Sequence, residues 1–115
     1  MKYPLEQLND LEFEGISYKK LMCVAFDLAL LVNYSHKSFF KFSYHDGVLE
    51  GLDDRIKVRF IELLKKYCKK YDLQYIVSLI DSDIPKGNLE LIKQENVCLE
   101  LNDNDDQGKL FKCSF

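Results

Sequence analysis

The sequence predicts an α/β fold, in which a small parallel sheet with flanking helices is followed by a C-terminal antiparallel hairpin. Two observations support this class. The apolar runs 39–44 and 74–80 have the length and the aromatic or β-branched composition of strands. Between them, 54–71 carries apolar residues at helical spacing on one side and lysines on the other. Strand, helix and strand form one right-handed crossover, so we expect the two strands to be parallel.

The first expected element is a helix from Ser17 to about Tyr34. Ser17 is a suitable N-cap, and apolar residues recur at helical spacing from Leu21 to Val32. Such a wide apolar stripe is typical of a helix that packs on a sheet. We expect residues 1–14, which are polar with scattered leucines, to form an N-terminal arm of a single domain.

The second strand and the C-terminal region follow from local composition. The run 74–80 is almost continuously apolar, as expected when both faces of a sheet are covered. A loop containing Pro85 and Gly87 should follow, and then a short helix over 88–94. The runs 97–101 and 109–115 flank an acidic turn that contains glycine, which predicts the hairpin.

Composition limits the class of protein. With 115 residues, 47% of them hydrophobic, the chain can bury one core but not two. Its net charge of −3 argues against nucleic-acid binding by this chain alone. The longest apolar run, 21–32, is too short to cross a membrane, and the N-terminus does not have the pattern of a cleavable signal. We therefore expect a cytoplasmic protein whose four widely spaced cysteines are buried thiols.

The segment with the clearest chemistry is 39–54, an aromatic strand that ends in an acid and is followed by a loop and a helix. An acid at the C-terminal tip of a parallel strand is a common ligand of Mg²⁺ in nucleotide-binding α/β proteins. Asp46 is the candidate for this role, although it could instead be a loop acid that caps the next turn. Asp53 could contact a partner subunit, and it also suits the N-cap of the following helix.

Three segments resemble parts of the ABC-type ATPases of the SMC and Rad50 group. Residues 46–53 are similar to the Walker B and D-loop pattern, which runs Asp-Glu-Pro, three variable residues, then Leu-Asp, and the spacing from Asp46 to Asp53 is the same. Residues 14–21 resemble the signature loop and the helix that it caps, and 74–81 resemble the strand that ends in the switch histidine. The segments occur in the order of that family.

The chain is most similar to the C-terminal lobe of the bacterial SMC-like family of uncharacterised proteins DUF2326. The similarity is carried by four short stretches, 18–21, 25–28, 44–47 and 51–55. It implies the C-terminal half of an ABC/SMC-type head in which ATP is held between two protomers. In that arrangement Asp46 serves Mg²⁺, Asp53 reaches the partner, and the loop around Gly15 and Ser17 holds the γ-phosphate through backbone N–H groups at a helix N-terminus.

The chain departs from the ATPase pattern at four places. Gly47 stands where the catalytic Glu belongs, Ile80 stands where the switch His belongs, and the signature-like loop has no adjacent pair of glycines. The phosphate-loop pattern G-x-x-x-x-G-K-[ST] does not occur in the sequence. We therefore do not expect this chain to hydrolyse ATP alone. His45 and Glu50 are only weak candidates for a catalytic residue.

Other site hypotheses are weaker. Asp81 and Asp83, after the second strand, resemble the paired acids with which Toprim-type nucleases bind Mg²⁺, but a suitable Glu on an earlier strand is missing. The acidic loop 102–108 differs from a Ca²⁺ loop because its flanks are strand-like and the final Glu is absent.

The sequence thus gives two main functional hypotheses. In the first, the chain is the C-terminal lobe of an SMC/Rad50-like ATPase head. It then needs Mg²⁺ and ATP in the complete assembly and an N-terminal phosphate-loop lobe or a second copy as its partner. DNA is a partner only through the full assembly, no membrane is involved, and DNA maintenance or phage defence is the implied context. In the second, the chain is a non-catalytic interaction module that pairs through an exposed sheet edge.

Overall fold

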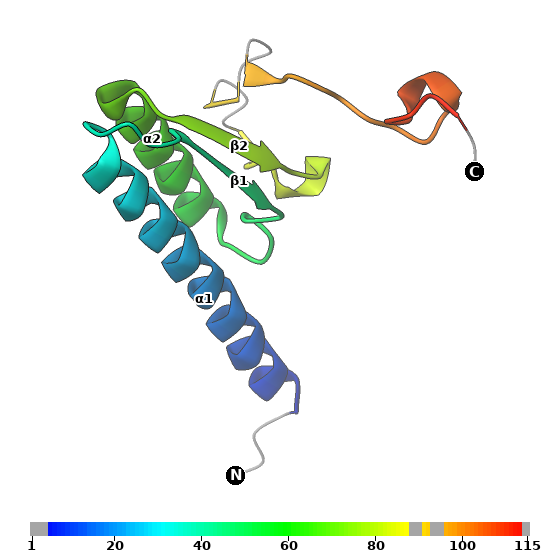
Figure 1. Cartoon of the computed structure of the whole chain (residues 1–115). Coiled ribbons are helices and arrows are strands. Elements are labelled where there is room, and N and C mark those ends of the chain that lie inside the picture. The colour runs from blue at the N-terminus through cyan, green and yellow to red at the C-terminus, as the bar shows by residue number, and fades with distance from the viewer. Residues whose placement is uncertain (1–4, 88–90, 93–95, 114–115) are drawn as a thin grey trace.

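The computed structural model describes residues 5–87, 91–92 and 96–113, with the side chains of α1 described at Gly15 and from Ser17 onward, and it shows a small α/β unit (Figure 1). Its elements in chain order are α1 (Leu5–Tyr34), β1 (Phe42–Asp46), α2 (Asp54–Tyr71) and β2 (Gln74–Ser78). Single-turn 3-10 helices follow at η1 (Asp81–Asp83) and η4 (Asp106–Gly108). Within these residues, no helix is both long enough and apolar enough to cross a lipid bilayer.

The strands β1 and β2 pair in parallel, which confirms the predicted crossover. Phe42 lies opposite Gln74, and Asp46 lies opposite Ser78. The first strand begins later than predicted because Phe39 and Phe40 lie in the connection from α1. There the Phe39 ring contacts the rings of Tyr34 and Phe40, at centroid distances of 5.2 and 4.1 Å.

The helix α2 has the predicted bounds, and its two ends explain why. Asp53 is the N-cap, and its carboxylate accepts a hydrogen bond of 2.8 Å from the backbone N–H of Arg55. At the other end Asp72 adopts the left-handed conformation, and its N–H donates to the carbonyl of Cys68. A left-handed residue satisfies the last free carbonyls of a helix and turns the chain away from the helix axis. The chain therefore enters β2 directly.

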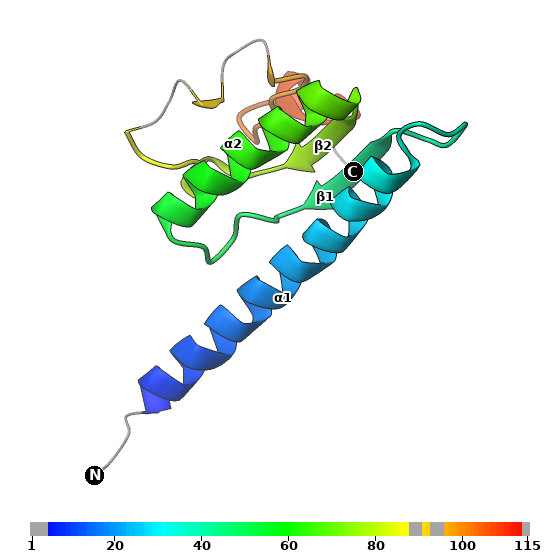
Figure 2. The same ribbon diagram turned by 90° about the vertical axis from the view of Figure 1, so that its left-hand side faces the viewer.

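Both helices cover the same face of the sheet (Figure 2). One core cluster joins Val24 of α1 to Ile61 of α2, and a second joins Leu28 and Leu31 of α1 to Leu64 of α2; the ring of Tyr75 on β2 packs against both clusters. The loop between β1 and α2 also contributes buried side chains, which are Val48, Leu49 and Leu52. This loop is therefore part of the core.

The other face of the sheet is open. Phe42, Tyr44 and Ile76 are 50%, 57% and 43% exposed on it. We predicted from the apolar composition of 74–80 that both faces would be covered. In the part of the chain that the structure describes, only one is, because α1 and α2 lie together on the opposite side.

The helix α1 is longer than predicted. It begins at Leu5, so Ser17 lies inside the helix and is not its N-cap. The Ser17 side chain is buried, and its hydroxyl lies 3.5 Å from the carbonyl oxygen of Glu50. Residues 5–14 of the predicted arm continue the same helix, which extends beyond α2 and the sheet (Figures 1 and 2); residues 1–4 lie outside the described residues.

The predicted C-terminal hairpin is wrong for the residues described. The turn forms, since the N–H of Asn102 donates to the carbonyl of Gly108 at 2.9 Å, but 96–113 contain no strand. Leu99, Leu101, Leu110 and Phe111 remain exposed. A two-stranded hairpin needs a surface on which to bury one face, and none is provided here. The helix predicted over 88–94 lies mainly outside the described residues.

The cysteines also differ from the prediction. All four are free; Cys68 is half-buried, whereas Cys23, Cys98 and Cys113 are exposed. Cys68 alone contributes to a core cluster, the one around Leu64 and Leu73. Burial raises the pKa of its thiol, so this thiol stays protonated at neutral pH.

We expect Leu49→Ala to lower the free energy of unfolding by about 2–5 kcal/mol, because truncation of this 1% exposed side chain leaves a cavity under the loop between β1 and α2. Urea unfolding followed by circular dichroism measures the change. Leu110→Ala, at an exposed leucine, is the matched control and should change stability by less than about 0.5 kcal/mol. Equal effects of the two substitutions would contradict the assigned core.

Candidate functional site

The C-terminal edge of the sheet places a carboxylate beside a hydroxyl. Asp46 ends β1, Ser78 ends β2, and the Ser78 hydroxyl donates a hydrogen bond to the Asp46 carboxylate. The hydroxyl of Tyr44 lies 3.2 Å from the same Ser78 oxygen. Asp46 is exposed. An exposed carboxylate at this end of a parallel strand can bind a hard cation directly or through water.

The backbone conformation of the loop after Asp46 explains why position 47 is glycine. Gly47 adopts φ +59°, in the left-handed region that side chains disfavour. Its N–H donates to the carbonyl of Ser78 at 3.1 Å, and its carbonyl accepts from the N–H of Glu50 at 3.2 Å. Position 47 is where the ATPase pattern has an acid. In this chain the left-handed conformation of the tight turn favours glycine at position 47, so no acidic side chain is available there.

Glu50 is tied to α1. Its carboxylate lies 3.4 Å from the ammonium group of Lys20, and its carbonyl faces the Ser17 hydroxyl. Both partners in the ion pair are solvent-exposed, so the pair contributes little to stability. Its effect is to hold the loop between β1 and α2 against the middle of α1. The predicted weak catalytic role of Glu50 has no further support in these contacts.

Asp53 carries out the N-cap role that the sequence suggested. The backbone N–H of Arg55, followed by its guanidinium group, holds the pKa of the Asp53 carboxyl below its usual value. The guanidinium lies 3.5 Å from the second carboxylate oxygen. The carboxylate is therefore charged at neutral pH and remains about half exposed at the same end of the molecule as the loop.

The side chain of His45 contacts α1 and β2. Its Nε2 lies 2.9 Å from a carboxylate oxygen of Asp27 on α1, its Nδ1 lies 3.4 Å from the Ser43 hydroxyl, and its ring stacks on Tyr75. Neighbouring residues on a strand point to opposite faces, so His45 faces the helices while Asp46 faces the open side. The pair of Asp27 and His45 links α1 to β1. Sequence reasoning missed it, although Asp27 is the only acid between Ser17 and Tyr34.

The buried hydroxyl of Tyr75 has no hydrogen-bond partner among the described residues. Burial, and then the nearby charges of Asp27 and Cys68, raise the pKa of this phenol well above its ordinary value. An unpaired buried hydroxyl costs free energy, and here the ring contacts of Tyr75 with both core clusters offset that cost.

The other predicted site residues are not brought together. Asp81 and Asp83 share η1, but Asp83 is buried and Asp81 is exposed. In the described residues, no group of three or more His, Cys, Asp or Glu side chains could hold a metal ion. Gly15 and Ser17 lie inside α1, so no free helix N-terminus is present at the position where the signature-like loop would need one.

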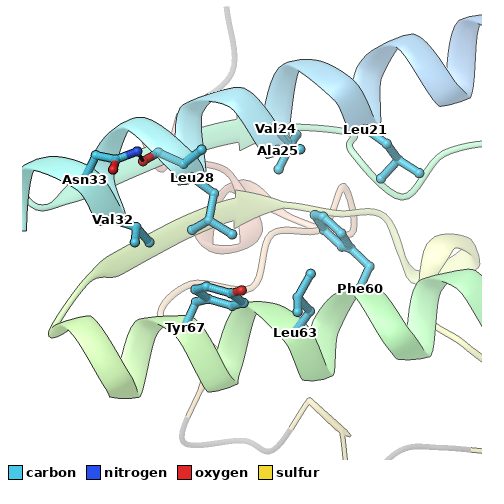
Figure 3. A pocket seen from close by; sticks show the side chains of 10 residues that line it. Leu21, Val24, Ala25, Leu28, Val32, Asn33, Phe60, Leu63 and Tyr67 are labelled. Carbon is cyan, nitrogen blue, oxygen red and sulfur yellow. Dashed lines mark hydrogen bonds between the residues drawn. The ribbon is translucent and has the colours of Figure 1, made fainter.

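A separate apolar groove of about 500 Å³ lies between α1 and α2 (Figure 3). Leu21, Ala25 and Val32 lie along its α1 side, and Phe60, Leu63 and Tyr67 lie along its α2 side. Its lining is almost wholly apolar, with Asn33 at one end. No sequence pattern pointed to this groove, because it depends on how the two helices are placed.

Comparison with protein-family models matches residues 7–115 to a family described as uncharacterised proteins conserved in bacteria, DUF2326. No curated protein matches the chain, and no solved structure does.

We expect Gly47→Ala to destabilise the fold by about 1–2 kcal/mol, because an L-residue is strained at this positive φ. The added Cβ would meet Glu50 only at an ordinary contact distance of 3.7 Å. The loss of stability would therefore come from backbone strain and not from a steric clash. Gly47→Asn is the control. Asn tolerates the left-handed region better than Ala, so this variant should lose less stability than Gly47→Ala. Thermal unfolding ranks the three proteins, and an Ala variant as stable as the parent would contradict the strained turn.

The raised pKa of Tyr75 means that the folded state favours the neutral phenol, so stability is complete below the ordinary value of 10.0 and falls as the pH rises above it. We expect Tyr75→Phe to keep or raise stability at pH 7, by up to about 1 kcal/mol, and to lose less than the parent at pH 11. Urea unfolding at both pH values tests this. Tyr44→Phe, at an exposed phenol, should follow the parent; identical pH dependence in all three proteins would refute the assignment.

Proposed function

The chain belongs to the DUF2326 family of uncharacterised proteins conserved in bacteria, and from that premise we propose that it is the C-terminal lobe of an SMC- or Rad50-like ATPase head. In this role it contributes the Walker B, D-loop and signature-like segments to a composite nucleotide site. A phosphate loop from an N-terminal lobe supplies the remainder, because the sequence of this chain contains none.

The observation that carries the proposal is the exposed Asp46 carboxylate at the C-terminal end of β1, beside Ser78 on the parallel neighbour β2. Nucleotide-binding α/β proteins bind their ligands at this edge of the sheet. Hydroxyl and carboxylate oxygens suit Mg²⁺, which prefers hard oxygen ligands and keeps several waters. The donor chemistry therefore fits this cation.

Each residue near this edge has a defined part in the proposed site. Asp46 would hold Mg²⁺ or its water, and the Ser78 hydroxyl fixes the orientation of the carboxylate. Bound Mg²⁺ supplies positive charge that neutralises phosphate oxygens. Asp53 caps the N-terminus of α2 at the same end of the sheet, and about half of its side chain is exposed, where a partner subunit would reach it.

Hydrolysis is not proposed for the isolated chain. Gly47 offers no side chain to polarise a water, and its left-handed backbone disfavours any replacement. A catalytic acid would have to come from the partner or from another position. Gly15 and Ser17 would need a break in α1 before their backbone N–H groups could hold phosphate, because those groups lie within a continuous helix.

A second candidate is a non-catalytic interaction module. It is supported by the open face of the sheet, on which Phe42, Tyr44 and Ile76 are exposed together. Apolar side chains gathered on one face are typical of an interaction site. The two candidates are compatible if the phosphate-loop lobe is the partner that covers this face. DNA maintenance or phage defence is the context that the SMC resemblance suggests by analogy.

Isothermal titration tests the proposal. The chain alone should not bind Mg²⁺-ATP, whereas its mixture with the phosphate-loop polypeptide encoded in the same or the adjacent coding sequence should bind it. Asp46→Asn should weaken the Mg²⁺-dependent binding at least about tenfold, because it removes the anionic ligand. Asp72→Asn is the matched control, since Asp72 ends α2 in a left-handed conformation that Asn tolerates, and it should have no effect. A mixture that does not bind Mg²⁺-ATP would exclude the composite site.

A further inference from the structure

The helix α1 is apolar on two sides, and only one of them is buried in the chain. Val24, Leu28 and Leu31 face the core. On another side, Tyr18 and Met22 are 55% and 71% exposed, and this row continues through Ala25, Ala29 and Val32. These five positions are spaced alternately by four and three residues, which is the pattern of a coiled-coil seam.

The C-terminal part of this seam forms one wall of the apolar groove (Figure 3). Ala25, Ala29 and Val32 line it from α1, and Leu63, which is 46% exposed, faces them from α2. Small residues on the α1 wall leave room for another helix to approach closely. A helix laid in the groove would contact α1 and α2 at once, as in a helical bundle.

The same spacing continues toward the N-terminus through Gly15, Leu11 and Leu8. This half of α1 extends beyond α2 and the sheet (Figures 1 and 2). Among the described residues, a Cβ added at Gly15 would meet no atom within 4 Å beyond its own helix backbone, so no described contact explains glycine in mid-helix. Glycine there is unfavourable to the helix by itself, but it allows close approach of a second backbone.

We propose that the seam pairs with the seam of a second copy, as an antiparallel α1–α1 pair whose projecting halves lie in the two grooves. With the two-fold axis between Tyr18 and Met22, these two residues pair across the axis, and Gly15 meets Ala25. Farther out, position 11 lies opposite position 29 and position 8 lies opposite position 32. This register lays the projecting half of each copy along the groove of the other, and one symmetry operation fills both grooves and closes the assembly.

Charge favours a second copy in the antiparallel direction. Residues 5–16 contain four acids and no lysine or arginine, whereas α2 contains seven basic and two acidic residues. Exposed Arg59, Lys66 and Lys70 flank the groove residues Leu63 and Tyr67 along α2. The antiparallel pair brings the acidic half of one copy beside the basic helix of the other. A parallel pair would place the two acidic halves against each other.

Sedimentation equilibrium over a concentration series tests the proposal without any nucleotide, so its failure is distinct from failure of the composite ATP site. The parent chain should be a dimer. Ala29→Glu, in the groove, and Leu11→Glu, in the projecting half of α1, should each weaken dimerisation at least about 100-fold by placing a charge in the seam. Cys23→Glu changes an exposed position of α1 away from the seam and should leave dimerisation unchanged. Circular dichroism checks that each variant is folded.

Cross-linking tests the direction of the pair. In a chain whose four cysteines are replaced by serine, Leu11→Cys combined with Ala29→Cys should form a covalent dimer on oxidation with diamide. Each single variant should remain uncross-linked, because in the antiparallel pair neither position faces itself. A cross-link in the single variants would indicate a parallel pair and overturn the proposal. A parent chain that is monomeric at its highest soluble concentration would also overturn it, whatever other helix the groove then binds.

Discussion

Parallel pairing of β1 with β2 is the constraint on which the rest of this structure depends. Two parallel strands cannot be joined by a tight turn, so the chain must cross over, and α2 is that crossover. The crossover puts the ends of both strands at the same edge, which brings Asp46 beside Ser78. It also fixes α2 on one face, where the first helix α1 joins it around Tyr75.

The two helices on one face explain both unusual surfaces of the molecule. Because α1 and α2 share that face, the described part of the chain leaves the opposite face of the sheet uncovered, with Phe42, Tyr44 and Ile76 exposed. Because they meet each other only partly, an apolar groove stays open between them. Exposed apolar surfaces of this kind are typical of sites at which another protein or another copy of the chain binds.

The candidate site shows which predictions a sequence can support. The position of Asp46 at a strand tip and of Asp53 at a helix N-cap followed from short-range patterns, and the structure has both. His45 and Asp46 are neighbours in the sequence, but alternation along the strand sends them to opposite faces. The partner of His45 is Asp27, eighteen positions away on α1, and only the docking of that helix brings them together. The left-handed turn at Gly47 gives a physical reason for the missing acid that the sequence alone could only note.

The sequence by itself determined the elements whose signals are local: the bounds of α2, the β1–α2–β2 crossover and the acid that ends the first strand. These depend on helical period, capping and turn residues within a few positions of one another. The tertiary structure decided what depends on distant contacts. It showed that α1 runs without a break through Ser17, that the residues around the acidic turn 102–108 do not pair as strands, and that one face of the sheet stays open. Each of these outcomes depends on whether a second surface is present to bury an apolar side chain, and no local pattern carries that information.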